Sequence, residues 1–122
     1  MSQTFPRERR LLSAADFRRV FKRPVKSSDA FFTVLARSHA GPAQVSRLGL
    51  AIAKKQLRRA VDRNRVKRLA REYFRQHVPE GCNLDFVVMV RAAARQRSNS
   101  ELSQSLQGHF QRLLEKQASE QA

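Results

Sequence analysis

The residues with the clearest chemistry lie between Arg63 and Glu72, in the segment RNRVKRLARE. Five of these ten residues are Arg or Lys, whereas Val66, Leu69 and Ala70 recur at helical spacing. The guanidinium group of Arg binds two phosphate oxygens at once, and Lys binds phosphate as a point charge. The pattern therefore predicts an amphipathic helix with one face in a core and the other against a polyanion.

Positive charge is concentrated around this segment. The 122 residues carry a net charge of +15, and the isoelectric point is near 11.7. Residues 46–75 hold eleven basic and two acidic side chains, a local charge of +9. A solvated polar face is the alternative interpretation, but such a face usually alternates the two signs of charge. Because 41% of the residues are hydrophobic, the composition predicts a basic globular domain that favours nucleic acid.

A helical wheel divides the basic helix into two faces. The apolar arc, which we expect to pack on a sheet, comprises Val66, Leu69, Ala70, Tyr73 and Phe74. The opposite, basic side comprises Asn64, Arg65, Lys67, Arg68, Arg71 and Arg75. Arg63 lies near the boundary, and the amide of Asn64 adds a group suited to a base edge or a ribose hydroxyl.

The sequence offers few side chains with which the protein itself could hydrolyse a phosphodiester. A protein nuclease needs clustered carboxylates for metal ions, or a histidine acid and base. Neither pattern occurs at ligand-like spacing, Cys82 has no CxxC partner, and the four glycines form no phosphate-binding loop. The scattered candidates include Asp16, Asp29, Asp62, Glu72, Asp85, His39, His77 and His109. We therefore expect neither catalytic residues nor metal ligands in the protein.

A short helix is predicted near the N-terminus. Ser13 and Asp16 form a capping box, and Leu12 and Phe17 have the spacing of a hydrophobic staple. Pro24 ends the helix, because proline disfavours helical geometry at the residue before it.

Three strands are expected beside the two helices already described. Phe31–Arg37 and Leu48–Ala53 predict antiparallel strands joined by a hairpin-type loop over 39–46, and a further short strand near 25–29 is allowed. The apolar run Asp85–Val90 predicts a central, buried strand.

The remaining segments complete an α+β fold. The basic helix is expected over 59–77 and is ended by Pro79. A basic connection over 91–97 leads to a second capping box at Ser98–Glu101 and a helix that runs to Leu114. We predict a single-domain α/β sandwich, with helices packed on a small mixed sheet in the order α-β-β-α-β-α.

One domain is expected over residues 1–122, with fraying at 1–10 and 115–122. The N-terminal residues MSQTFPRERRLL lack the apolar stretch of a signal peptide, and no apolar run approaches the roughly 20 residues of a membrane span. The single cysteine, Cys82, fits a reducing compartment. These features favour a cytoplasmic protein without a membrane partner.

The basic segment and its flanks resemble the protein subunit of bacterial ribonuclease P. The family's signature helix has the form RNRxKRxxRE, and residues 63–72 match each fixed position. The resemblance extends to DFRRVFK at 16–22, LGLAIAKK at 48–55, DFVVMVR at 85–91 and the leucine-rich last helix. It therefore covers nearly the whole chain in the family's order.

The resemblance implies an α+β fold with a left-handed βαβ crossover, which runs against the usual right-handed preference. It also implies the protein subunit of a ribonucleoprotein endoribonuclease, in which an RNA subunit removes the 5′ leader of precursor tRNA. The RNA would carry catalysis and hold Mg²⁺, and one protein would bind one RNA. Contact with the catalytic RNA would be made by Arg63, Asn64, Arg65, Lys67, Arg68 and Arg71.

The family also implies a cleft between the first helix and the sheet for the single-stranded leader. Phe17 and Phe21 share a helix face, and a base stacked on an aromatic ring contributes about 1–3 kcal/mol. Packing in the core is the alternative role for both rings. Lys54 and Lys55, at the end of a strand beside the cleft, are expected to contact phosphates.

Strand alternation separates the residues of the first long strand into two sets. We expect Phe32 and Val34 to enter the core, and the other set to face the cleft. That other set is Phe31, Thr33 and Leu35.

Other functions compete with this interpretation. A generic RNA-binding or ribosomal protein would have the same basic helix but no role in tRNA cleavage. A helix-turn-helix DNA-binding protein would need a second short helix before Arg63, where the pattern predicts a strand instead. A stand-alone protein nuclease lacks the necessary ligands.

Overall fold

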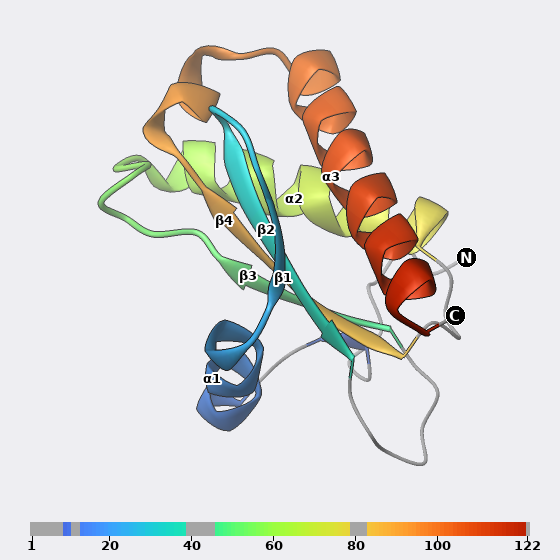
Figure 1. Cartoon of the computed structure of the whole chain (residues 1–122). Helices are drawn as coiled ribbons and strands as arrows, with labels where there is room; N and C mark the ends of the chain where they lie inside the picture. The colour runs from blue at the N-terminus through green and yellow to red at the C-terminus, as the bar shows by residue number, and fades with distance from the viewer. Residues whose placement is uncertain (1–8, 11–12, 39–45, 79–82, 122) are drawn as a thin grey trace, which may run out of the picture.

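The computed structural model describes residues 9–10, 13–38, 46–78 and 83–121, with side chains described up to Lys116. Four strands form one mixed sheet that carries helices on both faces (Figure 1). The predicted fold class is confirmed, and β1 is the short strand allowed near 25–29. The elements are α1 (Ala14–Lys22), β1 (Val25–Ser28), β2 (Phe32–Ser38), β3 (Arg47–Ala51), α2 (Ala60–His77), β4 (Leu84–Val90), the 3₁₀ helix η3 (Ala92–Gln96) and α3 (Asn99–Gln121).

The strand order across the sheet is β1-β2-β4-β3. β4 is antiparallel to β2 and parallel to β3, so α2 makes a crossover connection between two neighbouring parallel strands. β2 and β3 run in opposite directions as predicted, but the predicted hairpin is wrong because β4 lies between them. β4 takes that central place because its apolar run is buried on both faces. Of the 39–46 loop, only Ser46 lies within the described residues.

The main core lies between the sheet and the pair α2 and α3. On α2, the fully buried residues are Val66, Ala70 and Phe74, as the helical wheel predicts. The ring of Phe86 on β4 meets Phe74 edge-on at 5.9 Å between centroids, and it meets Phe110 of α3 at 5.0 Å. This aromatic cluster fixes the inner face of the basic helix against the sheet.

The opposite face of the sheet carries a smaller apolar cluster beneath α1. Val20 of α1 packs there with Leu35 of β2 and Val87 of β4, and all three are buried. Phe32 and Val34 belong to the main core instead, so the predicted alternation along β2 is confirmed for these residues. In Figure 1, α1 lies at one end of the sheet, apart from α2 and α3.

One of the two predicted capping boxes is complete, at the start of α3, and the other, at the start of α1, forms one of its two hydrogen bonds. Ser13 Oγ accepts the backbone N–H of Asp16 at 3.1 Å. The second box is reciprocal: Ser98 Oγ accepts the N–H of Glu101 at 3.2 Å, and Glu101 Oε1 accepts the N–H of Ser98 at 3.3 Å. Leu12 of the predicted staple lies outside the described residues, as does Pro79.

Residues near both ends of the chain belong to the described structure. α3 continues to Gln121, past residue 115, because the closing residues favour helix. Arg9 is only 5% exposed; its Nε donates to the Ser46 carbonyl at 3.3 Å and its Nη2 to the Val78 carbonyl at 3.2 Å. These long-range bonds join Arg9 to the residue before β3 and to the residue after α2, whereas the fraying expected over 1–10 and 115–122 stays a prediction. Neither α3 nor any other helix in the described part of the chain combines the length and apolar character needed to cross a membrane.

A polar cluster joins α3 to the turn between β1 and β2. The imidazole of His109 is fully buried, with Nδ1 2.6 Å from Ser27 Oγ and 3.1 Å from Arg112 Nη2. Its Nε2 lies 3.1 Å from Asp29 Oδ2, which also accepts a hydrogen bond from Ser105 at 2.5 Å.

Burial lowers the pKa of His109 below its usual 6.5, although Asp29 opposes the shift. Burial alone would raise the pKa of Asp29, but hydrogen bonds outweigh it and lower that pKa to about 2.

The free energy of unfolding is expected to fall as the pH drops below about 6.5, because of His109. The unfolded chain takes up a proton near that pH, whereas the folded chain keeps the imidazole neutral to lower pH. Above about 6.5 both states are neutral and His109 contributes no pH dependence. Asp29 adds a separate loss as the pH falls from 3.8 towards 2. Urea unfolding between about pH 7.5 and pH 5 measures the His109 effect.

The matched variants for this measurement are His109→Gln and His77→Gln. His109→Gln should flatten the dependence between those pH values, whereas His77→Gln, at the exposed end of α2, should leave it in place. An equal slope in the His109→Gln protein and the unsubstituted protein would contradict the assignment.

Candidate nucleic-acid interface

The outer face of α2 presents unpaired basic and amide groups to solvent. Asn64, Arg68 and Arg71 are exposed, and Lys67 is half-buried. Within the described residues, these four side chains make no hydrogen bond or ion pair. Their spacing of three and four residues aligns Asn64, Arg68 and Arg71 on one helical stripe. This stripe is the predicted basic surface, with its donors free for a phosphate backbone.

Two further residues of the predicted RNA contact are engaged within the protein. Arg63 Nη1 donates to the carbonyls of Leu57 and Arg58 at 2.9 and 2.8 Å, which fixes the linker between β3 and α2. Arg65 donates to the carbonyls of Ala94, Arg95 and Arg97 and to Asn99 Oδ1, at 2.8 to 3.4 Å. Arg65 therefore ties α2 to η3 and to the start of α3. The sequence pattern did not distinguish these two residues from the outward-facing ones.

The face of the sheet beneath α1 is partly uncovered. Phe21 of α1 is 43% exposed, and Phe17 is half-buried against the small cluster of that face. Thr33 and Leu35 lie on this face as predicted, but both are buried, and Leu35 is covered by α1. Met89 on β4 and Ala51 on β3 are half-buried apolar residues of this face.

A buried carboxylate holds α1 in place over the sheet. Asp85 of β4 is completely buried, and Arg47 of β3 donates to both of its oxygens at 2.8 Å. Arg19 of α1 also donates to Asp85. Asp16, one turn earlier on α1, lies 3.6 Å from Arg47. The hydrogen bonds to Asp85 raise the pKa of Arg47. The network therefore fixes the helix that carries Phe17 and Phe21.

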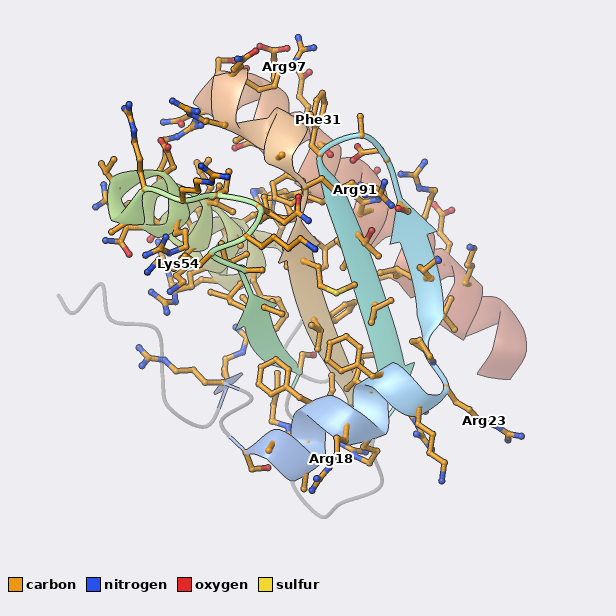
Figure 2. The ribbon with its side chains drawn as sticks, turned by 90° about the vertical axis from the view of Figure 1, so that its left-hand side faces the viewer. Arg18, Arg23, Phe31, Lys54, Arg91 and Arg97 are labelled. Atoms are coloured by element: carbon orange, nitrogen blue, oxygen red, sulfur yellow. The ribbon has the colours of Figure 1, made fainter. Side chains whose placement is uncertain are left out.

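Polar groups occupy the end of this face that is remote from α1, as Figure 2 shows. Arg91, just after β4, donates to Ser28 Oγ at 3.0 Å and to Thr33 Oγ1 at 3.3 Å. Lys54, just beyond β3, is exposed. Arg91 was not among the residues predicted from the sequence. Strand alternation could have placed Arg91 on this face. Residues an even number of positions apart along a strand face the same side of the sheet, and Arg91 is separated in this way from Asp85 and Met89.

Two predicted cleft residues lie elsewhere. Phe31 packs against the main core, and the Arg97 guanidinium lies 5.2 Å from its ring centroid (Figure 2). Alternation fails there because Phe31 precedes β2 in a turn, where its backbone N–H donates to Asp29 Oδ1. Lys55 lines a separate hollow between the start of α2 and η3. Of the residues predicted for the leader cleft, Phe17, Phe21, Thr33 and Leu35 therefore lie on the face beneath α1, and Lys54 lies at its border.

A basic outer face on α2 and two aromatic rings on α1, over the opposite face of the sheet, are features of an RNA-binding protein. No group of His, Cys, Asp and Glu residues within the described ranges is arranged to hold a metal ion. The family model of Ribonuclease P matches residues 5–114. The chain therefore belongs to the ribonuclease P protein family, and it acts in tRNA processing as a subunit of that ribonucleoprotein endonuclease.

Similar proteins agree with this membership. The ribonuclease P protein component of Methylococcus capsulatus is 47% identical over 108 residues, which cover 87% of this chain and 81% of that protein. The one from Thioalkalivibrio sulfidiphilus is 46% identical over 113 residues, covering 93% and 92%. Among solved structures, the Staphylococcus aureus RNase P protein superposes with a TM-score of 0.73 at 27% identity, covering 84% and 93%. The Thermotoga maritima protein gives 0.67 at 29% identity, covering 81% and 92%.

Proposed function

We propose that this subunit handles two RNAs on two separate surfaces. The outer face of α2 docks on the catalytic RNA, and the α1 face of the sheet holds the 5′ leader of precursor tRNA. The supporting observation is that α1 and α2 pack on opposite faces of the sheet, in two distinct apolar clusters. A leader held along α1 therefore does not compete with the docking of α2.

Docking is assigned to the side chains of α2 that have no partner within the described protein: Asn64, Lys67, Arg68 and Arg71. Arg63 and Arg65 support this surface by fixing the linker before α2 and the segment packed beside it. Each cation that meets a phosphate releases condensed counterions, so docking should weaken steeply with salt.

Leader binding is assigned to the rings of Phe17 and Phe21 on α1. Leu35 lies beneath this helix, and Thr33 lies further along β2, next to Arg91. Stacking on aromatic rings tolerates any base, which suits leaders of differing sequence. Lys54 and Arg91 stand at the other end of this face, where they would meet leader phosphates (Figure 2). Affinity gained from the leader is absent in mature tRNA, so product release is favoured.

The chemical step is assigned to the RNA subunit in the cytoplasm. Mg²⁺ would be held mainly by that RNA, in a complex of one protein with one RNA. Mg²⁺ supplies a metal-bound nucleophile and charge stabilisation in phosphodiester hydrolysis. The protein's contribution is to screen phosphate repulsion, which strengthens the binding of Mg²⁺ by the RNA.

Reconstitution tests this function directly. The protein is added to the catalytic RNA at low Mg²⁺, and cleavage of precursor tRNA is measured. We expect leader removal under these conditions only when both components are present, because the added cations offset the repulsion that otherwise requires high Mg²⁺.

Each other outcome points to a different function. Cleavage by the protein alone would indicate a protein nuclease. Tight RNA binding with no effect on leader removal would indicate the generic RNA-binding protein of the alternative interpretation.

A further inference from the structure

A hollow of about 420 Å³ opens beside the first turn of α2. One wall is the linker between β3 and α2 together with the start of α2, and it carries Lys55, Arg58 and Arg59. The other wall is η3, which carries Arg95. Four cations therefore converge on this hollow, against the single carboxylate of Asp62.

Little of this charge is neutralised within the protein. Arg95 Nε lies 3.7 Å from Asp62 Oδ2, with the Arg95 side chain 52% exposed. Lys55, Arg58 and Arg59 are exposed and form no hydrogen bond or ion pair through their side chains within the described residues. Like charges brought together without partners repel one another, so an anion bound between the walls would relieve this repulsion.

Both walls are held by bonds within the protein. The backbone N–H of Ala92 in η3 donates to Gln56 Oε1 at 3.1 Å, which joins the two walls directly. Leu57, between the cationic residues of the linker, is completely buried in the main core. Arg63 fixes the linker carbonyls and Arg65 fixes those of η3. The spacing of the cations across the hollow is therefore set by the fold.

We propose that this hollow binds a backbone phosphate of the catalytic RNA. This proposal rests on the docking function of α2 and extends the docking surface around its N-terminus. A phosphodiester suits the hollow because guanidinium groups from two walls can bind different oxygens of one phosphate. The positive end of the α2 dipole adds to the attraction. The catalytic RNA is the source, since the hollow opens at the first turn of the same helix that carries the docking residues.

The test removes one charge from each wall. Arg58→Gln plus Arg95→Gln is compared with the unsubstituted protein for equilibrium binding of the catalytic RNA at several salt concentrations. The logarithmic salt slope should flatten by about 0.7 to 0.9 for each phosphate that the variant no longer binds. The matched control is Arg18→Gln plus Arg23→Gln, two exposed cations on and just after α1, which should leave the slope unchanged. Thermal unfolding of both proteins verifies that they remain folded.

Two further measurements distinguish failure of this proposal from failure of docking by α2, and a phosphate of the catalytic RNA from a phosphate of the leader. Arg68→Gln plus Arg71→Gln tests docking by the outer face of α2 independently; if this pair flattens the slope and the hollow pair does not, only the hollow proposal fails. Precursor binding to the assembled holoenzyme, with leaders of several lengths, tests the other source. Loss of leader-length dependence in the hollow pair, with an unchanged slope for catalytic RNA, would assign the hollow to the leader and overturn the proposal.

Discussion

Replacing Asp85 with Ala is expected to lower the free energy of unfolding by about 3 kcal/mol, the lower part of the range for breaking a buried ion pair. Asp85 is completely buried, and its removal leaves Arg19 and Arg47 without their shared acceptor. Solvent limits the loss, because the two arginine side chains remain 32% and 25% exposed. The midpoint of thermal unfolding should fall by roughly 10 °C.

A surface ion pair provides the matched control for Asp85. Glu72 lies 2.9 Å from Arg75, and the two side chains are 45% and 32% exposed. Glu72→Ala should therefore change the stability by less than about 1 kcal/mol. Asp85→Asn keeps the shape of the side chain but loses its charge, so its loss of stability should lie between those of Asp85→Ala and Glu72→Ala. Equal unfolding midpoints for Asp85→Ala and Glu72→Ala would refute the structural role assigned to this carboxylate.

Local periodicity predicted much of the fold because each element buries one face. The helical wheel identified Val66, Ala70 and Phe74 as buried, and strand alternation separated Val34 from Leu35. These assignments need only the geometry of a single helix or strand. The apolar run of β4 likewise predicted its central place in the sheet.

Contacts between distant elements could not be predicted in this way. Arg65 was assigned to RNA with its neighbours, yet its acceptors lie about thirty residues away in η3 and α3. Asp85 was counted only as a scattered carboxylate, although it joins arginines that lie 38 and 66 residues away. A sequence pattern records that a residue is charged, whereas its partner depends on how the chain returns.

The sequence therefore predicted which helix carries the basic surface, but not which of its residues hold the fold together and which face solvent. The basic side of α2 contains two arginines that maintain the fold and a stripe that faces solvent. The cations around the hollow come from the linker before α2 and from η3, a 3₁₀ helix that composition described only as a basic connection. Lys55 was assigned to the leader by its position after a strand, but the turn that follows β3 carries it to the hollow.

Replacing Phe17 and Phe21 together with Ala is expected to abolish the dependence of precursor binding on leader length. Each stacked base contributes about 1–3 kcal/mol, or roughly 5- to 150-fold in the dissociation constant. The measurement compares precursors with leaders of increasing length, bound to the holoenzyme. In the unsubstituted complex, affinity should rise with the first nucleotides of the leader and then level off once the face is filled.

The two rings differ in how deeply they are buried, so their effects on stability and on leader binding can be separated. Phe17 packs with Val20 and Leu35 in the small cluster, so its loss also costs stability. Phe21 is 43% exposed, so Phe21→Ala alone should weaken leader binding with little change in unfolding. Val61→Ala, which shortens a 69% exposed residue on α2, is the control for general loss of apolar surface. Leader-length dependence that survives in Phe21→Ala and in the double variant would place the leader elsewhere, because Phe17 and Phe21 are the two aromatic residues of α1 and the described strands add no ring to the cluster beneath it.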